Sequence, residues 1–214
     1  MDGYSNIKAG IARIYKAQIL SLIASLLAVI ASFIMTVGTS MVLTAENIES
    51  AAALGNVLSL ILAVCGTAAL VLLIVSLVME IIGLNASKTE NIYFGYALNV
   101  VITGIICALA AGGMNDGPVK SALNNIHGII NLVTILLIIM GIRAVAEGAE
   151  LDEKGRRTSA RIIASVVGEF ICKIITGMDV SFGIVLSASI AIVIIELVYY
   201  ISFIKLLGQA KEEL

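Results

Sequence analysis

Residues 161–180 read RIIASVVGEFICKIITGMDV, and whether this stretch crosses a membrane decides the fold of the chain. The stretch is almost entirely apolar, yet it holds Glu169 and Lys173 four positions apart. If the stretch is helical, both side chains lie on the face that also carries Arg161. A charge near the middle of a span costs about 2.5–3.5 kcal/mol, which offsets the gain from the apolar residues. We therefore expect a membrane span that needs neighbouring helices to remain inserted.

The composition of the whole chain is typical of a membrane protein. The chain has 214 residues, of which 60% are hydrophobic and only 13% are charged. A soluble domain of this length could not cover that much apolar surface with polar side chains. Nucleic-acid binding is excluded as an expectation, because no basic face with interleaved aromatic residues is present. The sequence predicts an all-α, polytopic transmembrane helix bundle whose main partner is the lipid bilayer.

Hydropathy predicts six spans, arranged as three helical hairpins in a single integral membrane domain over residues 1–214. The apolar run that begins at Ile19 is too long for a cleavable signal peptide and is read as the first span. Polar stretches separate the spans, and one of them, ELDEKGRRTSAR at residues 150–161, is predicted to be a cytoplasmic loop. The predicted spans cover about residues 17–38, 52–84, 92–113, 122–147, 160–178 and 182–207.

The basic residues predict the orientation of these spans. Cytoplasmic loops carry an excess of Lys and Arg, which places both termini in the cytoplasm and the protein in the cell (plasma or inner) membrane. If residues 161–180 lay on the membrane surface instead, Lys205 and Lys211 would be outside, so the charge distribution favours a true span. On the predicted cytoplasmic side lie 11 of the 13 basic residues: Lys8, Arg13, Lys16, Lys88, Arg143, Lys154, Arg156, Arg157, Arg161, Lys205 and Lys211.

Three charged residues are candidates for a site inside the membrane: Glu169, Lys173 and Glu196. Glu169 lies eight residues after Arg161 and Glu196 nine residues before Lys205, so both lie roughly 12–13 Å from their basic markers. Intramembrane charges often mark transport paths, which predicts binding of a cation, a proton or a small polar solute. In the alternative interpretation, Glu169 and Lys173 neutralise each other and Glu196 reaches the cytoplasmic interface.

A second set of polar residues lies in the outer half of the fourth predicted span. His127 and Asn131 share a helical face and either line an outward vestibule or form interhelical hydrogen bonds. His127 has no second histidine or thiolate at ligand spacing, so no metal site and no cofactor is predicted. The cysteines lie inside apolar runs and are expected to be small packing residues: Cys65, Cys107 and Cys172.

Small residues recur every four positions in several predicted spans, for example Gly104, Ala108 and Gly112. Such stripes allow helices to approach closely, which favours packing within one chain over a homo-oligomer face.

Enzyme motifs are missing. HGIIN at residues 127–131 has the spacing of bacterial CAAX-type intramembrane proteases, and DEKGRR at residues 152–157 loosely resembles the acidic and arginine motif of that family. In that family the acidic motif precedes the histidine, whereas here it follows the histidine. The chain is therefore predicted not to be an enzyme.

The stretch NASKTENIYFGYALNVV, residues 85–101, resembles small, uncharacterised bacterial six-span membrane proteins. In size and predicted topology the chain also looks like the membrane subunits of energy-coupling-factor vitamin transporters. Two functions follow as expectations. One is a small transporter, or its membrane subunit, with a polar mid-membrane site. The other is a non-catalytic scaffold or accessory protein that acts through helix contacts with a partner subunit or a second copy.

Overall fold

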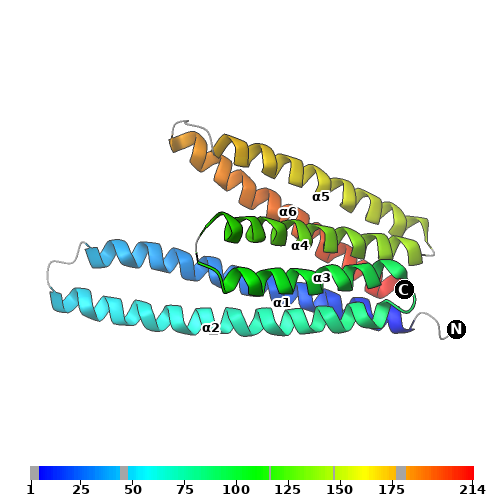
Figure 1. The fold of residues 1–214 in the computed structure, drawn as a ribbon, viewed down its shortest axis with the longest axis horizontal. Coiled ribbons are helices and arrows are strands. Elements are labelled where there is room, and N and C mark those ends of the chain that lie inside the picture. Colours follow the sequence, from blue (N-terminus) through cyan, green and yellow to red (C-terminus); the bar gives the residue numbers. More distant parts are fainter. Residues whose placement is uncertain (1–4, 44–47, 116, 147, 177–181) are drawn as a thin grey trace. The chain divides into compact units, whose positions relative to one another are not determined.

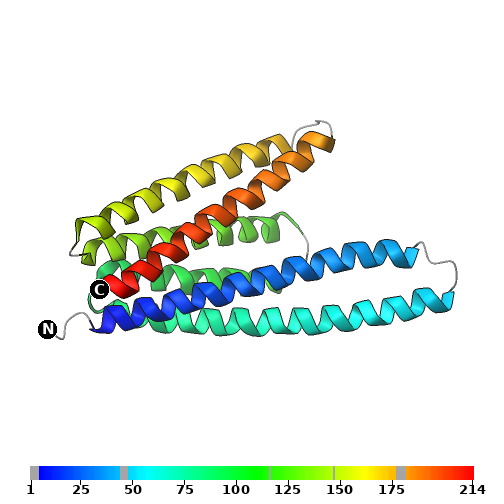
Figure 2. The same ribbon diagram turned by 180° about the vertical axis from the view of Figure 1, so that it is seen from behind.

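The computed structural model describes residues 5–43, 48–115, 117–146, 148–176 and 182–214, apart from some side chains within the helices. Within these ranges no strand occurs, which confirms the all-α prediction. The helices are α1 (Ser5–Leu43), α2 (Ile48–Ser87), α3 (Ile92–Gly112), α4 (Pro118–Val145), α5 (Ala149–Thr176) and α6 (Phe182–Glu213). Helix α3 runs beside α4, and α5 runs beside α6 (Figures 1 and 2).

Local sequence signals set the ends of the central helices. The Asn91 side chain accepts a hydrogen bond of 2.9 Å from the Tyr93 backbone N–H, which satisfies one free donor at the start of α3. At its end the Gly113 N–H donates to the Leu109 carbonyl at 3.2 Å. Pro118, the only proline of the chain, takes the first position of α4, where a missing N–H costs nothing. The apolar runs before and after this position are thus free of proline.

Four stretches within the described helices are long and apolar enough to cross a bilayer: Ser5–Thr39, Ala52–Ser87, Ile92–Gly112 and Ile190–Glu213. This is the architecture of a membrane-embedded protein. Helix α1 has 39 residues and is about 58 Å long, whereas a bilayer core is about 30 Å thick. Part of α1 therefore extends beyond the hydrocarbon core, which explains why the helix is longer than the predicted span. The count of six spans and the placement of both termini stay predictions.

The prediction of a loop at residues 150–161 is wrong, because these residues form the first turns of α5. Glu150 and Asp152 lie in the first turn, where negative charge interacts favourably with the helix dipole. The Glu150 carboxylate also lies 2.6 Å from the Lys154 ammonium, one turn later. A polar composition is typical of loops, but here the alternating charges stabilise a helix.

The chain divides into two compact units. Unit 1 comprises Met1–Tyr15 and Ile81–Leu214, and unit 2 comprises Lys16–Glu80. In unit 1, α3 packs on α4, α4 on α5 and α5 on α6. The prediction of one integral membrane domain stays a prediction.

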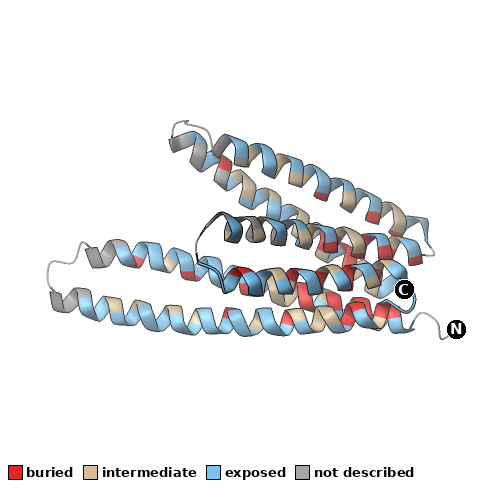
Figure 3. Cartoon of the chain, viewed as in Figure 1, coloured by how far each residue is buried: buried red, intermediate tan, exposed pale blue. Residues whose placement is uncertain are grey.

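The core of unit 1 lies at one end of its helices (Figure 3). We call it the basic end, because α5 and α6 carry Lys154, Arg157, Arg161 and Lys205 there. Toward the other end large apolar side chains are exposed, as expected of surfaces in contact with lipid. The largest fully buried side chains of unit 1 are those of Ile7, Ile11, Ile14, Leu84, Phe94, Ile138, Ile139, Ile142, Leu151, Ile162, Phe203 and Leu206.

Two glycines allow α1 and α2 to cross closely within unit 1. A Cβ added to Gly10 would lie 2.7 Å from the Gly83 carbonyl oxygen, and one added to Gly83 would lie 2.7 Å from the Gly10 carbonyl oxygen. No side chain fits between these backbones, so both positions require glycine. The Ser87 hydroxyl also packs against Gly10 and donates a 3.1 Å hydrogen bond to the Gly83 carbonyl.

Unit 2 is the remainder of the α1–α2 hairpin. Its buried polar contact is a 2.7 Å hydrogen bond from the Ser76 hydroxyl to the Ala17 carbonyl. Closer to the turn, Gly38 leaves room for the Leu58 side chain. Most of its described side chains are apolar and exposed, such as Leu60 and Val64. Surfaces of this kind face lipid or other helices in a membrane.

Candidate functional site

The structure places the predicted mid-membrane residues on two helices. Glu169 and Lys173 lie within α5, four residues and so about one helical turn apart. The side chains of Glu169 and Lys173 lie outside the described residues. Glu196 lies on α6 and is exposed. That these three residues form one site stays a prediction.

The two outer polar residues both lie on α4. Asn131 is exposed, and the side chain of His127 lies outside the described part of the chain. The vestibule and the interhelical hydrogen bonds that the sequence suggested for them both stay predictions. Among the described residues, no group of three or more His, Cys, Asp or Glu side chains is arranged to hold a metal ion. The three cysteines are free thiols of intermediate exposure.

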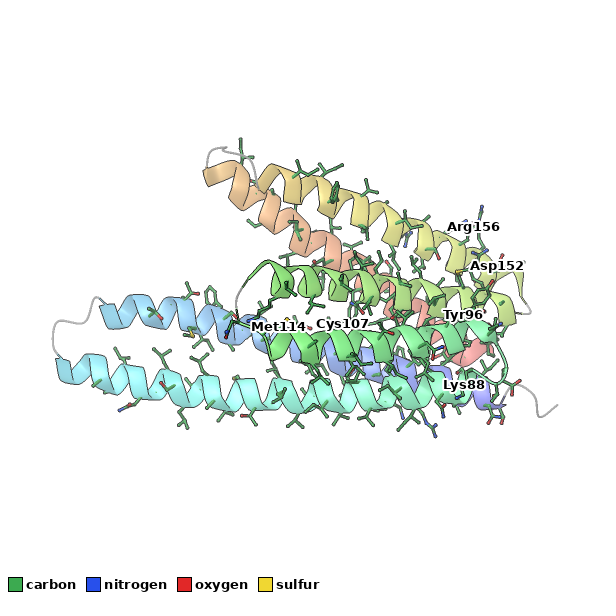
Figure 4. All side chains as sticks on the ribbon, viewed as in Figure 1. Lys88, Tyr96, Cys107, Met114, Asp152 and Arg156 are labelled. Atoms are coloured by element: carbon green, nitrogen blue, oxygen red, sulfur yellow. The ribbon has the colours of Figure 1, made fainter. Side chains whose placement is uncertain are left out.

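At the basic end, a polar contact holds α5 to α4. The Arg143 guanidinium Nε donates a 2.7 Å hydrogen bond to Asp152 Oδ1. Gly155, one turn after Leu151, is buried against the Arg143 stem, and a Cβ there would lie 2.5 Å from Arg143 Cγ. The missing side chain lets α5 lie directly on that stem. Asp152 and Arg156 lie at the same end of unit 1 as Lys88 and Tyr96, whereas Cys107 and Met114 lie toward the other end (Figure 4).

Ion pairs along α5 support its polar half. Glu153 accepts hydrogen bonds from Arg157 at 2.8 Å and from Arg156 at 2.7 Å, and these lower the pKa of its carboxyl, with Arg157 having the larger effect. The hydrogen bond from Lys154 likewise lowers the pKa of Glu150. These carboxylates therefore stay charged at neutral pH. Such pairs stabilise a helix only weakly, because water screens exposed charges.

Contacts with the last turns of α6 complete this end of the molecule. The Lys154 ammonium lies 3.9 Å from a Glu213 carboxylate oxygen. The Lys211 ammonium lies 4.9 Å from the centre of the Tyr15 ring of α1, a cation–π distance. Gly208 packs against the same ring. The end of α6 is thereby fixed beside α5 and the first part of α1.

A pocket of about 250 Å³ opens between α5 and α6 at the basic end. Its wall on α5 follows the spacing i, i+3, i+4, i+7, which places these residues on one helical face. The wall on α6 adds the Lys205 ammonium, the Ser202 hydroxyl, the Gln209 amide and apolar side chains. The polar residues that carry most of its charge and hydrogen-bonding capacity are Lys154, Arg157, Thr158, Arg161, Lys205 and Gln209.

Sequence reasoning missed this pocket because it assigned residues 150–161 to a loop. The signal was present in the spacing of Lys154, Arg157 and Arg161, which is helical and continues into the apolar part of the same helix. The partner wall on α6 could not be found in the same way, since Lys205 is distant in sequence.

No protein-family model, curated protein or solved structure matches the chain.

Proposed function

We propose that the protein is a non-catalytic, multi-pass membrane scaffold or accessory subunit that presents the first half of α5 to a partner. We call this segment, residues 149–160, the charged platform. One observation carries the proposal: the segment is a helix fixed at two sides. Asp152 holds it to α4 through the 2.7 Å hydrogen bond from Arg143, and Lys154 lies 3.9 Å from Glu213 of α6.

A fixed helix suits a binding surface better than a loop does. Ordering a flexible segment upon binding costs conformational entropy, and a segment that is already ordered avoids that cost. The platform also exposes its cations, since the side chains of Arg156 and Arg157 are 67% and 70% exposed. Both are paired with Glu153, so the platform presents both signs of charge, which favours selectivity between partners.

Site-specific photo-crosslinking in living cells tests this proposal. A photoreactive amino acid replaces Arg156 on the platform, and in a matched variant it replaces Phe170, which is 65% exposed on the apolar half of the same helix. We expect one discrete protein adduct from position 156 and none of the same mass from position 170. The proposal fails if position 156 gives no adduct, or if both positions give the same one.

A transporter is the second candidate, and the polar residues within apolar helices favour it. Glu196 and Asn131 are exposed on α6 and α4, and polar or ionisable side chains within apolar helices often mark transport paths. Proton flux into proteoliposomes, followed with a pH-sensitive dye, separates the two candidates. A transporter predicts flux in the wild-type protein that Glu196→Gln abolishes without loss of folding. Equal signals from protein-free liposomes and wild-type proteoliposomes would exclude proton transport.

We further propose that all six helices cross the membrane, with both termini in the cytoplasm. The distribution of Lys and Arg supports this topology. The test starts from a variant in which Cys65, Cys107 and Cys172 are replaced by alanine. A thiol from Gly113→Cys should react with an impermeant maleimide in intact cells, and one from Lys211→Cys only after permeabilisation. Labelling at position 211 in intact cells would indicate that α5 does not cross.

A further inference from the structure

The pocket between α5 and α6 has an excess of positive charge. Among its cations, Lys154 pairs with Glu150 at 2.6 Å and Arg157 with Glu153 at 2.8 Å. Among the described residues, no carboxylate lies within ion-pair distance of Arg161 or Lys205. The pocket thus keeps two cations that no described carboxylate neutralises, which favours an anionic ligand over a cation or a proton.

The donor set suits a tetrahedral oxyanion. The Arg161 guanidinium offers several N–H donors in a planar fork, a geometry that matches two oxygens of a phosphate. The Lys205 ammonium adds three donors on the opposite wall. The Thr158 hydroxyl and the Gln209 amide line the same pocket and can donate to the remaining oxygens. At about 250 Å³ the pocket lies below the range of about 300–1,000 Å³ typical of drug-sized ligands, so it suits a small head group.

The apolar surroundings of the pocket also bear on the ligand. Ile201 and Leu206 line it beside the cations, and along the same helix Val198 and Ile194 are exposed. A membrane lipid would place its phosphate in the pocket and its acyl chains along these residues. Basic pockets between transmembrane helices on the cytoplasmic side are typical sites for anionic lipid head groups.

We propose that this pocket binds a phosphate-bearing group, with the phosphate between Arg161 and Lys205. The group is either the head group of an anionic lipid or a small soluble phosphate ester. This inference goes beyond the proposed function and does not depend on a protein partner. It assigns the pocket a ligand, whereas the charged platform is assigned a partner protein.

The test uses the full-length protein purified in detergent, with thermal stability and native mass spectrometry as readouts. The probes are a short-chain phosphatidylglycerol, glycerol phosphate and, as a lipid without net charge, phosphatidylcholine. The pocket variant is Arg161→Gln with Lys205→Gln. The matched control is Arg13→Gln with Lys88→Gln, which removes the same charge from two exposed residues that do not line the pocket.

We expect saturable binding of a phosphate probe to the wild-type protein and at least about tenfold weaker binding to the pocket variant, since two charge-assisted contacts are lost. The control variant should keep wild-type affinity. Arg161→Lys with Lys205→Arg keeps both charges and should retain most of the binding, which separates loss of the site from loss of folding. Binding of phosphatidylglycerol alone identifies a lipid, and equal binding of glycerol phosphate identifies a soluble ester.

Two results would overturn the inference. One is equal weakening in the pocket and control variants, which indicates a general attraction to a basic surface. The other is no saturable binding of either phosphate probe. Neither result affects the crosslink expected at Arg156, so failure of this inference and failure of the proposed function are distinguishable.

Discussion

The α3–α4 contact and the α5–α6 contact lie in the same unit but differ in side-chain composition and in packing. Between α3 and α4, the Phe94 ring is fully buried against the backbone of Gly141. Between α5 and α6, a pocket lined with cations opens at the basic end beside buried residues such as Phe203, and among the described atoms a Cβ at Gly168 would meet only the end of the Ile195 side chain. The first contact is therefore close-packed at Gly141, whereas the second leaves space for a ligand at one side.

This difference predicts where substitutions will be tolerated. A close-packed contact responds to changes of a single methyl group, because the neighbouring atoms cannot move far. Where a contact has free volume and charged walls, a substitution changes the stability of the fold little and changes ligand binding strongly. Substitutions between α3 and α4 should therefore change mainly the stability of the fold. Substitutions in the pocket between α5 and α6 should change mainly ligand binding.

Phe94→Ala should give the largest loss of stability. The ring is 0% exposed, and its removal leaves a cavity between α3 and α4. Substitutions of this kind cost about 3–5 kcal/mol. The measurement is the free energy of unfolding in mixed detergent–SDS micelles, followed by circular dichroism. Phe170→Ala on α5 is the control, since this ring is 65% exposed and should change stability by less than about 0.5 kcal/mol. Similar losses in both variants would contradict a close-packed α3–α4 contact.

A matched pair of glycine substitutions compares the two contacts directly. A Cβ at Gly141 would lie 2.8 Å from Phe94 Cζ, and the buried ring has no room to move, so Gly141→Ala should cost about 1–3 kcal/mol. A Cβ at Gly168 would lie 3.4 Å from Ile195 Cδ1, an ordinary contact, so Gly168→Ala should gain up to about 1 kcal/mol from helix propensity.

The same unfolding assay reads both glycine variants. Effects of opposite sign support the difference in packing between the two contacts. Stabilisation by both substitutions would show that the α3–α4 contact has more space than the structure indicates.

The apolar runs were sufficient to predict helices at all six positions, because burial in lipid requires every backbone group to be bonded within its own segment. The polar first half of α5 was not predicted, since charged residues are common in loops. Its helix depends on the ion pairs of Glu150 with Lys154 and of Glu153 with Arg157, and on the hydrogen bond between Arg143 and Asp152. The first two follow from spacing, but the third requires α4 and α5 to be adjacent.

Close helix contacts were harder to predict from small residues alone. In the predicted stripe of α3, Gly104 is buried, but Ala108 and Gly112 are exposed. A close backbone approach involves Gly10 and Gly83 instead, from two different helices. Which small residue meets another helix depends on the rotation and crossing point of both helices, and a single helical pattern does not contain that information. For the same reason the α6 wall of the basic pocket was not predicted.

Breaking the α4–α5 connection should have a smaller effect than changing Phe94 or Gly141. Arg143→Gln keeps much of the stem that packs on Gly155 but removes the charge that holds Asp152. The two side chains are 34% and 49% exposed, so solvent screens their interaction and the expected loss is about 0.2–1 kcal/mol. A double-mutant cycle with Asp152→Asn measures the coupling, and a coupling energy of zero would show that the pair contributes nothing to holding the platform.

Acidification should have the smallest effect, confined to the charged platform. The Arg157 and Arg156 hydrogen bonds lower the pKa of Glu153 below its usual value of 4.5 in the folded state. Its contribution to stability is therefore complete above about pH 4.5 and is lost as the pH falls through the lower folded value. Hydrogen exchange of backbone amides in residues 149–160, corrected for the intrinsic pH dependence, should show weaker protection as the pH falls below about 4.5. Glu153→Gln should lower protection at neutral pH and reduce its pH dependence. Equal pH dependence in the variant and the wild type would show that Glu153 does not support this helix, and would leave the contacts of Asp152 with Arg143 and of Lys154 with Glu213 as the restraints on the platform.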